Sequence, residues 1–165
     1  MFTNKKIGII GTGNMGEILI RGLMEGNVVD RGNVLAAEIN PERKEFIQET
    51  YGINVESNAC AVAEKSDILI LAVKPQNLSQ VLTLISDSVN EEQLLISIVA
   101  GANTGTIAEH FPEKEMRVVR VMPNAPALVL TGASGMVAGR YATEEDIHVA
   151  RGIFNQVGIT VVVEK

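Results

Sequence analysis

The chain has 165 residues, of which 46% are hydrophobic and 21% charged, a length and composition typical of one globular domain. Its formal net charge of −6, without a basic stripe and with only 4% aromatic residues, argues against nucleic acid as a partner. No run approaches the roughly 18–20 apolar residues of a membrane span, and nothing before the first apolar run has the form of a secretion signal. The single cysteine cannot form an internal disulfide, and the two histidines do not have metal-ligand spacing. Together with the lack of an apolar span, these features lead us to expect a cytoplasmic protein without membrane contact or bound metal.

Short apolar runs alternate with segments of helical period, as in βαβ units wound into a parallel sheet. The run 67–73 is apolar on both faces, as a central parallel strand must be. Thr143 and the three acidic residues after it predict a capped helix start. The predicted strands are 7–10, 34–37, 53–55, 67–73, 94–99, 116–122, 132–139 and 159–163, and the predicted helices are about 15–24, 42–51, 75–88, 104–111 and 144–157.

A G-x-G-x-x-G motif, Gly11 to Gly16, follows the first strand directly and opens the first helix. In this context Gly11 permits a tight turn, Gly13 lets a pyrophosphate approach the backbone, and Gly16 allows close packing of helix on strand. A glycine-rich turn without a ligand is the weaker alternative. The pattern therefore predicts an α/β fold of the Rossmann type, a doubly wound and mostly parallel sheet with helices on both faces.

The choice of dinucleotide stays open at this point. Glu38 follows Gly16 by 22 residues at the end of the second strand, where an acid accepts hydrogen bonds from the adenosine ribose and repels a 2′-phosphate. By that rule the cofactor is NAD. Asn40, Arg43 and Lys44 follow at once, however, and a cation there could hold the 2′-phosphate of NADP.

Four segments, taken in chain order, closely resemble pyrroline-5-carboxylate reductase. They are Ile-Ile-Gly-Thr-Gly-Asn-Met-Gly at 9–16, Leu-Ala-Val-Lys-Pro-Gln at 71–76, Ser-Ile-Val-Ala-Gly at 97–101 and Val-Arg-Val-Met-Pro-Asn-Ala-Pro-Ala at 119–127. The resemblance covers residues 1–165 but matches only the N-terminal, NAD(P)-binding domain of that family. It implies that a C-terminal helical domain, which builds the dimer and much of the substrate site in such enzymes, is absent from this chain, and that the full-length protein is a homo-oligomer.

The resemblance and the motif together assign most candidate site residues to the cofactor and none to catalysis. Val99 to Gly101 would line the nicotinamide ribose, Asn58 would lie near the adenosine, and Met122 and Asn124 would lie beside the substrate, with a plain turn role as the alternative for Asn124. The predicted cofactor-binding residues are Ile10, Gly11, Thr12, Gly13, Asn14, Met15, Gly16, Glu38, Asn58, Ala72, Val73, Lys74, Pro75, Val99, Ala100 and Gly101.

The resemblance implies hydride transfer from NADPH, or alternatively NADH, to the C=N bond of 1-pyrroline-5-carboxylate, which gives proline. Two alternatives remain: a non-catalytic dinucleotide-binding regulator, and a hydroxy-acid dehydrogenase of the same fold, against which the segment 120–124 argues. We expect the 165 residues to bind cofactor without useful turnover. Cys60 is predicted to pack as a small buried residue, and neither His110 nor His148 is predicted to be catalytic.

Overall fold

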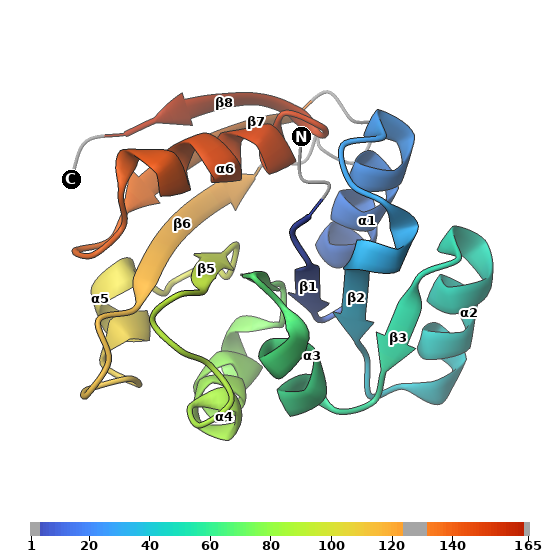
Figure 1. Ribbon diagram of the computed structural model, residues 1–165, viewed down its shortest axis with the longest axis horizontal. Helices are drawn as coiled ribbons and strands as arrows, with labels where there is room; N and C mark the ends of the chain where they lie inside the picture. The colour runs from blue at the N-terminus through green and yellow to red at the C-terminus, as the bar shows by residue number, and fades with distance from the viewer. Residues whose placement is uncertain (1–3, 124–131, 164–165) are drawn as a thin grey trace.

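The computed structural model describes residues 4–123 and 132–163, which form one eight-stranded sheet with helices on both sides (Figure 1). The strand order is β3-β2-β1-β4-β5-β6-β7-β8. Neighbouring strands are parallel except β6 and β7. The predicted Rossmann-type, mostly parallel architecture is therefore confirmed.

The predicted elements are all present, but the strand from 94 ends at Ser97 rather than 99, and the helices from 75 and 104 end at Ile85 and Ala108 rather than 88 and 111. The strands are β1 (Ile7–Ile10), β2 (Val34–Ala37), β3 (Asn54–Glu56), β4 (Ile68–Leu71), β5 (Leu94–Ser97), β6 (Arg117–Pro123), β7 (Gly132–Ala138) and β8 (Gly158–Val162). The helices are α1 (Asn14–Gly26), α2 (Pro41–Tyr51), α3 (Ala59–Lys65), α4 (Pro75–Ile85), α5 (Thr104–Ala108) and α6 (Glu144–Phe154), with a 3₁₀ turn η1 (Arg31–Asn33). Among the described residues, no helix is long and apolar enough to cross a membrane.

Two cores lie on opposite faces of the sheet, because successive side chains of each strand point to opposite sides. One core joins alternate strand residues to α1, α2 and α6, through Leu19, Ile47 and Phe154 among others. The other joins the remaining strand residues to α4 and α5 through Leu82 and Ile107, and to α3. Strands β1, β2, β4 and β5 are buried at every position, as the apolar runs predict.

The structure contains a helix, α3, that the sequence analysis did not predict. This helix has only seven residues, and alanine, cysteine and valine fill most of it, so it shows no clear apolar stripe. Its start signal is Asn58, whose Oδ1 accepts a hydrogen bond from the Cys60 N–H at 2.9 Å. Strand β4 also ends at Leu71, two residues earlier than predicted, although the Ala72 N–H still bonds to the Ile10 carbonyl of β1 at 2.9 Å.

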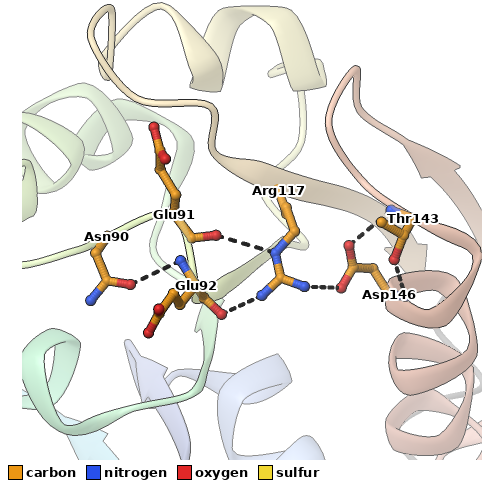
Figure 2. Close-up of polar contacts among 6 residues, drawn as sticks. All are labelled: Asn90, Glu91, Glu92, Arg117, Thr143 and Asp146. Carbon is orange, nitrogen blue, oxygen red and sulfur yellow. Dashed lines mark hydrogen bonds and ion pairs between the residues drawn. The ribbon is translucent and has the colours of Figure 1, made fainter.

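A polar cluster joins the start of β6 to α6 and to the loop before β5 (Figure 2). Arg117 Nη1 donates to Asp146 Oδ1 at 2.8 Å, and the guanidinium also donates to the carbonyls of Glu91 and Glu92. Asp146 Oδ2 in turn accepts from the Thr143 N–H, while Thr143 Oγ1 accepts from the Asp146 N–H. This is a complete capping box, so the predicted cap of the last helix is confirmed.

Candidate functional site

The candidate site lies at the carboxyl ends of β1 and β4, where the strand order reverses direction (Figure 1). Ligands of doubly wound sheets bind in the crevice outside such a switch point. Backbone hydrogen bonds join the loops there: Gly11 N–H donates to the Ala37 carbonyl at 3.1 Å, and Ala72 N–H donates to the Ile10 carbonyl. The loops after β1, β2 and β4 are thus held side by side.

The three glycines of the motif have different structural roles. Gly11 has a φ of 96°, and a Cβ there would lie 2.7 Å from the Ala72 carbonyl oxygen, so only glycine fits the turn. A Cβ at Gly16 would collide with the Gly11 carbonyl oxygen, which explains the close approach of α1 to the loop. Gly13 differs: its φ is −67° and a Cβ there would meet no atom within 4 Å. The fold therefore does not require glycine at 13, whereas a ligand lying against the loop would.

The start of α1 suits an anion. Gly13 is the N-cap residue, and no side chain caps the helix. The first backbone N–H groups of a helix carry partial positive charge and bind phosphate when no cap occupies them. The open space at Gly13 and the uncapped helix start therefore fit the pyrophosphate of a dinucleotide.

Glu38, at the end of β2, contacts the glycine-rich loop directly. Its Oε1 accepts hydrogen bonds from Thr12 Oγ1 at 2.5 Å and from the Thr12 N–H at 3.3 Å, and its Oε2 accepts from the Asn40 N–H at 3.0 Å. Thr12 is fully buried. The predicted ribose-binding acid thus lies at the expected place, but its carboxylate is largely occupied by the protein.

Arg43, one of the two cations predicted near a 2′-phosphate, is held between the loop and α1. Its Nε donates to the Thr12 carbonyl at 2.8 Å, its Nη2 pairs with Glu17 Oε2 at 2.7 Å, and its guanidinium lies over the Phe46 ring. Tyr51 donates to the other Glu17 oxygen at 3.0 Å, and burial, followed by this bond, raises the pKa of the phenol. The hydroxyl therefore remains a donor at neutral pH.

Sequence reasoning did not find Glu17 and Tyr51, which orient Arg43. Glu17 lies 26 residues before Arg43, and Tyr51 lies 34 residues after Glu17, so only the packing of α1 against α2 brings them together. The second predicted cation, Lys44, donates to Ser57 Oγ at 3.2 Å. Both cations lie at the β2 end of the site, where the adenosine ribose is expected.

Asn58 has a structural function that the resemblance did not imply, because its Oδ1 caps α3.

We expect Asn58→Ala to lower the free energy of unfolding by about 1 kcal/mol, the usual cost of losing an N-cap. Asn58→Asp keeps the capping oxygen but removes the amide N–H₂ donor, so it serves as the matched variant. If Asn58 also contacts the cofactor, a dinucleotide titration will show weaker binding in Asn58→Asp while urea unfolding shows unchanged stability. Equal affinity in the aspartate variant would confine Asn58 to capping.

The remaining predicted residues divide between surface and core. Lys74 and Pro75 are exposed at the start of α4, and Ala100 and Gly101 are exposed after β5. Val99, in contrast, is buried in the core, and its N–H donates to Ser97 Oγ at 3.2 Å. Ile10 is likewise buried, Gly16 is buried, and Met15, Ala72 and Val73 are half-buried.

Of the two residues predicted to lie beside the substrate, only Met122 is described, near the end of β6. Met122 is 41% exposed, which is unusual for a methionine in a central part of the sheet. Asn124 lies outside the described residues. Away from this edge, Cys60 is half-buried and its thiol donates to the Leu84 carbonyl, which agrees with the predicted packing role. His110 lies on the surface and contacts Ser79 and the Thr106 carbonyl.

Several known proteins that are similar to this chain in sequence and fold are pyrroline-5-carboxylate reductases. Pyrroline-5-carboxylate reductase from Methanosarcina acetivorans is 42% identical over 158 residues, which are 96% of this chain and 58% of the relative. The solved pyrroline-5-carboxylate reductase of Coxiella burnetii has a TM-score of 0.93 at 29% identity, covering 99% of this chain and 60% of that protein. The Plasmodium falciparum pyrroline carboxylate reductase, solved with NADP bound, has a TM-score of 0.85 at 30% identity, covering 97% and 58%.

These similarities confirm the resemblance inferred from the four segments. The chain spans less than two thirds of the length of the relatives it matches. A family model described as NADP oxidoreductase, coenzyme F420-dependent, matches residues 6–101, more than half of the chain. The chain therefore belongs to this oxidoreductase family.

Proposed function

We propose that the chain binds NADPH at the carboxyl edge of its sheet and forms the dinucleotide-binding part of an enzyme that reduces 1-pyrroline-5-carboxylate to proline. The observation that carries this proposal is the open space at Gly13, beside the uncapped start of α1. The fold itself would accept a side chain at this position, so the glycine is explained by a ligand that lies against the loop. The names of the relatives, and the NADP in the Plasmodium falciparum structure, support the substrate and the cofactor.

The contribution of this domain to the reaction is placement. When bound, NADPH supplies the hydride that adds to the imine carbon, while the imine nitrogen ends with a proton. The loop 11–13 and the start of α1 would hold the pyrophosphate, and Ala100 and Gly101 would let the nicotinamide ribose approach the backbone. Within the described ranges we assign no residue as the proton donor.

Selection of NADPH over NADH requires a cation for the 2′-phosphate, and Arg43 is the better placed of the two candidates. Its guanidinium already reaches the loop through the Thr12 carbonyl, and a planar guanidinium can bind a phosphate through two parallel hydrogen bonds. Binding of the 2′-phosphate would draw Arg43 away from Glu17. The cytoplasmic location, expected from the sequence composition, belongs to this proposal. So do the homo-oligomeric full-length enzyme and the separate C-terminal substrate domain, which rest on the sequence resemblance.

We expect the 165 residues to bind NADPH, more tightly than NADH, but to reduce pyrroline-5-carboxylate at well under a tenth of the roughly 10 s⁻¹ of a median enzyme. Hydride transfer needs donor and acceptor carbons in near contact in a site that excludes water. Gly13, Asn14, Lys74, Pro75, Ala100 and Gly101 are all exposed, so this edge is open to solvent.

Titration of NADPH fluorescence measures binding, and the chain helps here because it contains no tryptophan. Oxidation of NADPH with pyrroline-5-carboxylate present measures turnover, and chromatography identifies proline as the product. Absence of binding would contradict the proposed function. Turnover above about 1 s⁻¹ would show instead that these residues already enclose a complete active site.

A further inference from the structure

We propose that Glu38 is a positioning residue which clamps the glycine-rich loop through Thr12, and that it serves NADPH and NADH alike rather than selecting between them. This inference rests on the proposed dinucleotide site. An acid at the end of the second strand usually accepts hydrogen bonds from the ribose hydroxyls and repels a 2′-phosphate. The function proposed here for Glu38 is different.

The first step is the number of acceptor positions that remain on Glu38. A carboxylate has about four lone-pair positions for hydrogen bonds. Three of them are occupied by protein donors: Thr12 Oγ1, Thr12 N–H and Asn40 N–H. The distance of 2.5 Å from Thr12 Oγ1 is in the range of short, charge-assisted O–H···O⁻ bonds. The carboxylate charge is therefore directed mainly at the loop.

The second step is the position of Thr12. It lies between Gly11 and Gly13, two residues with high backbone freedom, in the segment that would touch the pyrophosphate. All of its polar groups bond to the region that follows β2: the N–H and hydroxyl to Glu38, and the carbonyl to Arg43. Because the Thr12 side chain is fully buried, it does not face the ligand side of the loop. Its function is to keep the loop in one conformation before the cofactor arrives.

The third step concerns cofactor choice. A clamp that orders the loop lowers the entropy cost of binding any dinucleotide, since both cofactors share the same pyrophosphate. Discrimination between them must then come from a group near the 2′ position that differs in its interaction with hydroxyl and phosphate, and Arg43 is such a group. Loss of the clamp should weaken both cofactors by the same factor.

Thr12→Val tests the clamp, because valine keeps the shape of the side chain but removes the hydroxyl donor. We expect the dissociation constants of NADPH and NADH both to rise about tenfold, with their ratio unchanged. Thr12→Ser keeps the hydroxyl and should bind within about twofold of the unchanged protein. Thr143→Val removes a capping hydroxyl at α6, away from the site, and controls for a general loss of stability, so it should leave both constants unaltered while lowering the melting temperature.

Glu38→Gln tests selection, because glutamine retains an acceptor for Thr12 but carries no charge. We expect a change in the ratio of the two dissociation constants of less than threefold. If Glu38→Gln changes the ratio of the two dissociation constants in favour of NADPH by more than tenfold, Glu38 does select between the cofactors, and that part of the proposal is overturned. This test does not depend on whether Thr12→Val folds. A folded Thr12→Val protein that binds like the unchanged one would overturn the clamp alone. Failure of the unchanged protein to bind either dinucleotide would overturn the proposed function and this inference together.

Discussion

Replacement of Gly13 by aspartate is expected to weaken dinucleotide binding at least a hundredfold while the protein remains folded. The fold tolerates the change because Gly13 has a φ of −67° and a Cβ there meets no atom within 4 Å. The new carboxylate would lie in the space we assign to the pyrophosphate. Two like charges about 5 Å apart at an effective dielectric constant of about 20 repel by roughly 3 kcal/mol, which is about a hundredfold in affinity.

Calorimetric titration with NADPH and NADH measures this effect, and circular dichroism with urea unfolding verifies the fold. Gly32→Asp is the matched control: it adds the same charge at a glycine that also has free space, but in η1, before β2 and away from the carboxyl edge. The control should bind both cofactors normally. Unchanged affinity in a folded Gly13→Asp protein would mean that this loop does not hold the pyrophosphate.

Most of the fold could be predicted because the signals are local and repeat along the chain. The buried strand β4 and the capping box of α6 each follow from residues within a few positions of one another. Helix α3 could not be predicted in the same way, since seven mostly small residues give no measurable apolar period. Its Asn58 cap was a usable signal that the family resemblance had assigned to cofactor binding instead.

In the candidate site, too, some features could be predicted from the sequence and others could not. The geometry of the glycine motif follows from residue type, because positive φ and close backbone approach both need glycine. The contacts among Glu17, Arg43 and Tyr51 join two helices and depend on how α1 packs against α2, which no local pattern encodes. The same holds for Glu38: its position at the end of β2 was predictable, but its bonds to Thr12 were not. Contacts between residues close in the sequence, such as the capping box, were thus predictable, whereas contacts between residues far apart in the sequence were not.

The second large effect is expected on stability rather than on binding, at the ion pair of Arg117 and Asp146 (Figure 2). The Asp146 side chain is only 4% exposed, so its charge depends on protein partners. Replacement of Arg117 by methionine keeps most of the apolar stem but leaves that carboxylate without its cation. Removing one partner of a buried pair typically costs about 3–5 kcal/mol. We expect about 3 kcal/mol here, because the Thr143 N–H and the start of α6 still stabilise the charge.

Urea unfolding gives this free energy, and Lys65→Met provides the matched control. Lys65 pairs with Glu56 at 3.1 Å, but the two side chains are 51% and 30% exposed. The bonds from Lys65, and then from Asn54, lower the pKa of Glu56, yet solvent screens such a pair and its loss should cost no more than about 0.5 kcal/mol. A cost of Arg117→Met no larger than that of Lys65→Met would show that the buried pair does not stabilise the fold.

A double variant separates the pair from the rest of the cluster. Asp146→Asn removes the charge that Arg117 neutralises while an amide oxygen can still accept the Thr143 N–H. Combined with Arg117→Met, it should cost clearly less than the sum of the two single changes, because no buried charge is left unpaired. Arg117 begins β6 and pairs with Leu94 at the start of β5, at the amino ends of the strands and opposite the cofactor edge. NADPH affinity of the folded variants should therefore remain unchanged, so that this cluster acts on the free energy of unfolding and Gly13 acts on binding.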